Sequence, residues 1–151
     1  MVKQPNTVMA FAAHHNRFGF VFMIGQQPMD WQLVYQAAAT PELAKRKIAG
    51  WLHFYKPDLI VTEDLAGSQR KGRKAQQLIL AIKEVAFATD ADNAEVARSQ
   101  PFANKYEQIE RLCEEFPQMK AVAPARRRIY DAEPPYVTLF EALALAKQAS
   151  R

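Results

Sequence analysis

The sequence predicts an α/β fold with a mixed sheet and helices on both faces. Two observations support this class. The chain opens with aromatic and apolar stretches that form a hairpin and a third strand, and helical and short apolar stretches then alternate to the end. With 151 residues and 49% hydrophobic side chains, the chain suits one compact domain over 1–151.

The first three strands are read from their composition. Residues 7–13 are nearly all apolar, as in a strand covered on both faces. Residues 18–24 are aromatic and β-branched, and Gly25 and Pro28 end this stretch. Residues 31–35 supply a third strand. The order predicts a meander at the start of the chain.

The first helix and the fourth strand follow. Thr40 suits an N-cap and Pro41 the first helical position, and Pro57 closes the helix. Residues 58–62 read as a short buried strand. The polar run 66–74 reads as a loop before a second amphipathic helix.

The later elements repeat this alternation. We expect a helix over 75–86, a strand over 94–98 and a third helix that ends before Pro117. Pro134 and Pro135 open a last helix that is apolar almost all round, so we expect it to be buried.

Composition narrows the function classes. No apolar run approaches the roughly 20 residues that a bilayer span needs, and the start lacks a signal-type stretch, so we expect no membrane partner and a cytoplasmic location. The single Cys113 cannot form an internal disulfide and reads as a core residue. The net charge of +4 favours anionic partners.

Acidic and histidine side chains follow two of the predicted strands. Glu63 and Asp64 close the fourth strand, and His14 and His15 follow the first. Sites in such folds lie beyond the carboxyl ends of the strands. Glu141 interrupts the most apolar helix, where a charge needs a partner or a metal. The carboxylates can equally be ion-paired structural residues, and the two histidines can belong to a surface turn. The functional and the structural interpretation of these residues both stay open.

Basic side chains gather beside turns and on polar helix faces. The loop 66–74 has the composition of a phosphate-backbone contact. Such groups are also typical of solvated surface. The predicted nucleic-acid contacts are Arg17, Arg70, Lys71, Arg73, Lys74, Arg126, Arg127 and Arg128.

Four segments together resemble one family. Residues 7–12 (TVMAFA), 18–21 (FGFV), 57–63 (PDLIVTE) and 140–146 (FEALALA) are similar in order and spacing to the RuvC-like, Holliday junction resolvase branch of the ribonuclease H-like superfamily. The resemblance implies a five-stranded mixed sheet with helices on both faces. It also implies cleavage of branched DNA with two divalent metals, Mg²⁺ or Mn²⁺, in a homodimer.

The resemblance assigns the acidic positions one by one. Glu63 matches the fourth-strand glutamate and Glu141 the second acid of the last helix. Ala12 and Thr138 stand where the other two acids would be, so the resemblance implies a degenerate site. A two-metal site needs carboxylates that offset four positive charges. The candidate catalytic residues are Glu63 and Glu141, and the candidate metal ligands are Glu63, Glu141, Asp64 and His14.

Three functional hypotheses follow. The first is a nucleic-acid-binding protein that recognises branched or duplex DNA and whose metal-dependent cleavage is weakened or lost. The second is an active endodeoxyribonuclease of the junction-resolvase type with a rebuilt site, in which the missing ligands come from His14, His15, Asp64 or Asp131. The third is a non-catalytic protein-interaction module on the same scaffold.

Overall fold

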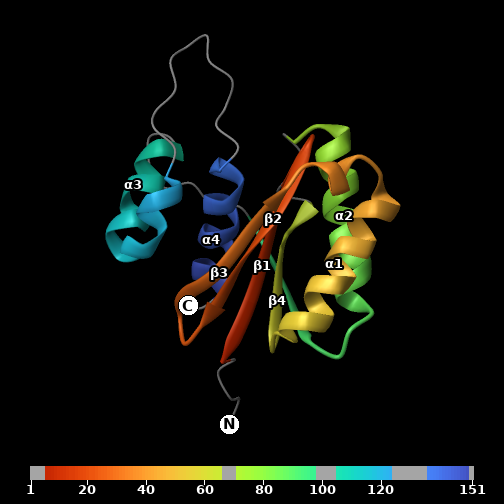
Figure 1. Cartoon of the computed structure of the whole chain (residues 1–151), viewed down its shortest axis with the longest axis horizontal. Helices are drawn as coiled ribbons and strands as arrows, with labels where there is room; N and C mark the ends of the chain where they lie inside the picture. Colours follow the sequence, from red (N-terminus) through yellow and green to blue (C-terminus); the bar gives the residue numbers. More distant parts are fainter. Residues whose placement is uncertain (1–5, 66–70, 98–104, 124–135, 150–151) are drawn as a thin grey trace.

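The sheet has five strands in the order β3-β2-β1-β4-β5 (Figure 1). The computed structural model describes residues 6–65, 71–97, 105–123 and 136–149. β1 pairs antiparallel with β2 and parallel with β4, and β4 pairs parallel with β5. The predicted five-stranded mixed sheet is therefore confirmed, with β1 at its centre.

The first three strands form an antiparallel meander. β1 (Thr7–His14) and β2 (Arg17–Ile24) are buried along almost their whole length. A two-residue turn, Gly25 and Gln26, has positive φ at both positions, as a type I′ hairpin turn requires. β3 (Gln27–Val34) starts earlier than the predicted strand at 31–35. Pro28 lies within it, which an edge strand tolerates because its outer amides have no partner.

The first helix, the fourth strand and the second helix build the middle of the chain. A short 3-10 helix, η1 (Gln36–Ala38), precedes α1 (Pro41–Tyr55). Thr40 caps α1 by accepting a hydrogen bond from the amide of Leu43 at 3.2 Å, as predicted. β4 (Leu59–Glu63) and α2 (Arg73–Phe87) follow. α2 begins two residues before the predicted helix, so Arg73 lies in its first turn and not in a loop.

The last part of the chain adds one strand and three helices. β5 (Asp92–Val96) lies two residues before the predicted strand at 94–98. α3 (Lys105–Glu115) leads into the 3-10 helix η3 (Pro117–Val122). α4 (Val137–Ala149) is buried on nearly all sides, as its composition predicts. The prolines 134 and 135 lie outside the described residues.

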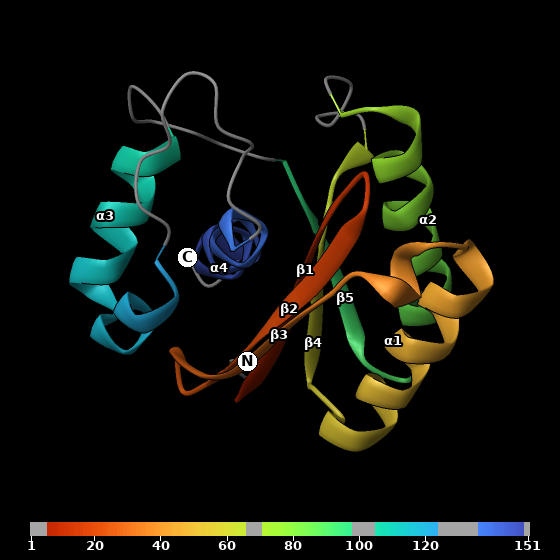
Figure 2. The same ribbon diagram turned by 45° about the horizontal axis from the view of Figure 1, so that its top comes forward.

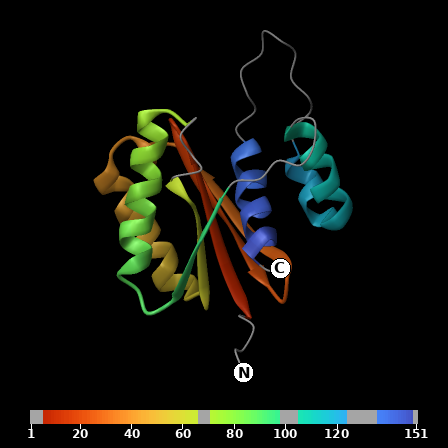
Figure 3. The same cartoon turned by 180° about the vertical axis from the view of Figure 1, so that it is seen from behind.

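Two hydrophobic cores lie on the two faces of the sheet. One joins the sheet to α3, η3 and α4, and the other joins it to α1 and α2. Figure 2 shows α4 between the sheet and α3, and Figure 3 shows the same layers from behind. Cys113 lies in the α3 and α4 core, where burial raises the pKa of its thiol. Among the described helices, none has the length and apolarity that crossing a bilayer would require.

Candidate functional site

Glu63 lies at the carboxyl end of β4 and points toward α4. Side chains alternate along a strand, and Val61 faces the α4 core, so Glu63 faces it too. Ala12 faces the same core from β1. The parallel register pairs Ala10 with Val61, and continuing it by two residues puts Ala12 level with Glu63. The glutamate side chain is only 2% exposed.

α4 presents two polar side chains to this end of the sheet. Thr138 and Glu141 are three residues apart, so they share one helical face. Thr138 is buried, and the Glu141 side chain is 11% exposed. The sheet and α4 therefore bring together the four positions that the resemblance selected. Two of them are carboxylates and two are not.

A lysine ammonium lies between the two carboxylates. The Nζ of Lys71 is 3.3 Å from Glu63 Oε2 and 3.1 Å from Glu141 Oε2. It also donates to the carbonyl oxygen of Ala13 at 2.9 Å. The Lys71 side chain is 8% exposed, which differs from the exposed phosphate contact that we expected. Charge pairing with two buried acids is the physical reason for its inward position.

The other polar residue of α4 at this site, Thr138, accepts a hydrogen bond from a buried arginine. Arg17 Nε donates to Thr138 Oγ1 at 2.9 Å, and Arg17 Nη1 donates to Asn16 Oδ1 at 3.1 Å. Arg17 is buried, unlike the exposed nucleic-acid contact we expected. Burial lowers the pKa of its guanidinium, while the charge of Glu141 opposes that shift. A guanidinium keeps its charge in proteins even so.

Among the described residues, two cations lie against the two carboxylates of the site. Glu63 and Glu141 contribute two negative charges, and Lys71 and Arg17 contribute two positive ones. Two divalent ions need several carboxylates that offset and bridge them. In the described parts of the chain, no group of three or more His, Cys, Asp or Glu side chains is arranged to hold a metal ion. The described residues at this site therefore do not fit a two-metal centre.

The remaining metal candidates lie beside this site. His14 Nδ1 and His15 Nδ1 are 2.9 Å apart at the end of β1. Burial, and next the charge of Arg17, lowers the pKa of His14 to about 4, so its ring is neutral at pH 7. Asp64 follows Glu63, and its backbone amide donates to Val96 at 2.9 Å. Asp131 lies outside the described residues.

Two of the predicted basic contacts are exposed beside the site. Arg73 and Lys74 occupy the first turn of α2, directly after Lys71 and the N-cap residue Gly72. Their side chains are solvent-accessible, so phosphate groups can reach them. The other predicted contacts, Arg70, Arg126, Arg127 and Arg128, lie outside the described residues.

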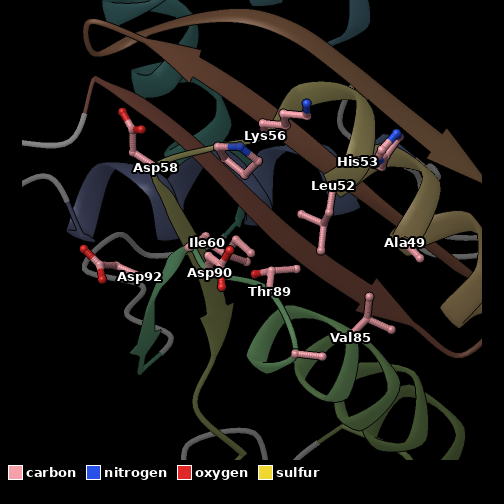
Figure 4. Close-up of a pocket in the computed structure, with 13 residues that line it drawn as sticks. Ala49, Leu52, His53, Lys56, Asp58, Ile60, Val85, Thr89, Asp90 and Asp92 are labelled. Carbon is pink, nitrogen blue, oxygen red and sulfur yellow. The ribbon is translucent and has the colours of Figure 1, made fainter.

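A pocket of about 810 Å³ opens at the opposite end of the sheet (Figure 4). It lies between the last turns of α1 and α2, above the starts of β4 and β5. Its lining mixes apolar side chains such as Leu52 and Val85 with charged groups of both signs, among them Lys56 and Asp90. Because it lies at the amino ends of the parallel strands, it is separate from the Glu63 and Glu141 site.

The sequence reasoning missed the partners of the buried acids. A buried glutamate needs a cation, but Arg70, Lys71 and Arg73 all follow Glu63 closely, so the sequence does not indicate which of them is the partner. The hydroxyl of Thr138 likewise accepts a hydrogen bond from a basic side chain, Arg17. Neither contact follows from periodicity.

Solved structures share the fold over almost the whole chain. Fowlpox virus resolvase in complex with substrate Holliday junction DNA superposes with a TM-score of 0.64 and 11% identity, covering 95% of this chain and 96% of that one. Thermus thermophilus RuvC gives 0.59 and 12%, covering 95% and 97%. Its complex with a Holliday junction substrate gives 0.56 and 12%, covering 93% and 89%.

Comparison of the sequence with protein families and with curated proteins finds no relative. No protein-family profile matches the chain, and no curated protein matches it. The structural likeness shows a RuvC-like, ribonuclease H-like fold, as the sequence resemblance implied.

Proposed function

We propose, from this RuvC-like fold and its internally neutralised site, that the chain binds branched or duplex DNA and that its metal-dependent cleavage is weakened or lost. The observation that carries the proposal is the ammonium of Lys71 between Glu63 and Glu141. An acidic site that already holds its counter-charge attracts divalent ions weakly, because a metal would have to displace the lysine.

Two features support DNA as the ligand. The compared fowlpox virus and Thermus thermophilus structures include complexes with Holliday junction DNA. Arg73 and Lys74 are exposed at the start of α2, next to the carboxyl end of the sheet. Exposed cations on a rigid helix suit contacts to the phosphate backbone, which supply most of the affinity in nucleic-acid binding.

DNA binding is tested with a labelled four-way junction and a duplex of the same sequence, in EDTA, over a series of salt concentrations. We expect the affinity for DNA to fall as the salt concentration rises. R73A and K74A should each reduce the slope of log affinity against log salt concentration by about one. K120A is the matched control, because Lys120 is exposed in η3 on the other face of the sheet. Undetectable binding to every nucleic acid tried would support a protein-interaction module instead.

Cleavage is tested on the same junction with Mg²⁺ or Mn²⁺. We expect binding without specific nicks, since the two carboxylates are paired with Lys71. The competing outcome is specific nicking that E63Q abolishes. That result would establish an active endonuclease whose ligands are completed by other groups, and it would remove the proposed loss of cleavage.

A further inference from the structure

We propose that the Lys71 ammonium is a built-in counter-ion that holds three elements together, and that its removal turns the space between Glu63 and Glu141 into a divalent-cation site. The inference deepens the proposed loss of cleavage at this site and rests on it. It does not depend on DNA binding.

Three oxygen atoms surround the ammonium of Lys71, two as hydrogen-bond acceptors and one as an ion-pair partner. A lysine ammonium has three N–H groups and no acceptor. Lys71 Nζ has three oxygen partners, at 2.9 Å in Ala13, 3.1 Å in Glu141 and 3.3 Å in Glu63. A buried cation that makes two hydrogen bonds and two ion pairs has little freedom to leave.

The three oxygen atoms come from three different elements. Ala13 belongs to β1, Glu63 to β4 and Glu141 to α4. One side chain thus connects the centre of the sheet to the last helix. Both carboxylates face the same ammonium, and like charges at close range disfavour the folded state. Lys71 offsets that repulsion without any added ion.

The backbone around Lys71 is held as well. Its carbonyl oxygen accepts a hydrogen bond from Gln76 Nε2 at 2.8 Å. Gln76 lies in the second turn of α2, so the helix fixes the point from which the lysine side chain enters the site. A tethered ammonium acts at a high effective concentration, which favours it over an ion that must bind from solution.

Thermal unfolding of four proteins tests the inference without DNA, each alone and with Mg²⁺, Mn²⁺ or Ca²⁺. They are wild type, K71M, K71M/E141Q, and K74M as the matched control, since Lys74 is exposed three residues away. We expect the K71M midpoint to lie roughly 10 °C or more below wild type. We expect divalent ions to raise the K71M midpoint in a saturable manner and to leave wild type and K74M unchanged.

The double variant K71M/E141Q identifies where the ion binds. It is expected to lose the cation response, because only one of the two carboxylates that face Lys71 would remain. The inference is overturned if K71M is as stable as wild type, if no divalent ion moves its midpoint, or if K71M/E141Q responds as K71M does. A saturable cation shift of wild type as large as that of K71M would overturn it as well.

A K71M protein that does not fold alone still gives a result. The variant K71M/E63Q/E141Q removes both charges with the lysine, and we expect it to fold without any cation. If it too fails to fold, Lys71 acts through packing and the counter-ion role is wrong. Because these tests measure stability, a failure of DNA binding leaves this inference standing, and the reverse also holds.

Discussion

Thr138 accepts a hydrogen bond from Arg17 in a part of the core that is closed to solvent. Both side chains are buried, so the guanidinium depends on protein acceptors for its Nε–H. A hydrogen bond to a charged group contributes more to stability than one between neutral groups, because the charge would otherwise lose its solvation. The hydroxyl at position 138 therefore has a structural role.

The first prediction concerns this hydroxyl. T138V keeps the shape of the side chain and removes the acceptor, so we expect a loss of about 2 kcal/mol in the free energy of unfolding, measured by chemical denaturation. T138S keeps a hydroxyl and should stay much closer to wild type. Equal stability of T138V and wild type would show that the Arg17 contact contributes nothing.

The second prediction concerns pH. The pKa of His14 falls from its ordinary 6.5 to about 4 in the folded protein, mainly through burial. Between these two values the unfolded chain binds a proton that the folded chain does not, so stability falls as pH decreases from about 6.5 toward 4. At pH 7 and above this contribution vanishes.

Denaturation midpoints at pH 7 and pH 5 measure the effect. H14Q should reduce the loss of stability at pH 5, whereas H53Q, a change at an exposed histidine of α1, should leave it as in wild type. The interpretation of His14 fails if H14Q and H53Q show the same pH dependence.

At the scale of elements, Gly19 lies where α4 packs against the meander. Gly19 in β2 pairs with Ala12 in β1 and Leu33 in β3. A Cβ atom at position 19 would lie 2.4 Å from the carbonyl oxygen of Gln32 and 3.1 Å from the side chain of Leu139 in α4. Glycine is therefore required where the helix that carries Thr138 and Glu141 meets the sheet.

The third prediction follows from this contact. G19A must displace backbone in β3 and the packing of α4, so we expect a loss of about 1–3 kcal/mol or more, measured by thermal or chemical unfolding. G50A provides the comparison, because a Cβ at position 50 of α1 meets no atom within 4 Å. There alanine should stabilise the helix by up to about 1 kcal/mol. If G19A is no less stable than wild type, α4 does not depend on this close approach.

At the scale of the whole molecule, the sequence predicted the order of the elements well. The apolar run of β1 and the aromatic run of β2 are buried on both sides of the sheet. Periodicity and turn residues report such burial directly. The ends of the two edge strands were predicted less well. β3 includes Pro28 and β5 starts at Asp92, and in an edge strand the pairing with the single neighbouring strand decides where the strand begins and ends.

The sequence resemblance selected four positions that lie together in the fold, but it did not predict the contacts among their side chains. The resemblance selected Ala12, Glu63, Thr138 and Glu141, and the fold brings these positions together. The role of Lys71 could not be read from the sequence, because a lysine in a polar loop has the same composition whether it faces solvent or a buried acid. Only the three-dimensional course of β1, β4 and α4 makes that distinction.

The most direct measurement is a titration of the free protein with Mn²⁺, in which unbound Mn²⁺ is counted by electron paramagnetic resonance. Wild type and E63Q are compared at equal concentrations. Because Lys71 is paired with both glutamates and Arg17 adds a second positive charge beside them, we predict that wild type binds no Mn²⁺ that E63Q fails to bind. One or two Mn²⁺ ions bound at stoichiometric ratio by wild type and lost in E63Q would contradict the internally neutralised site.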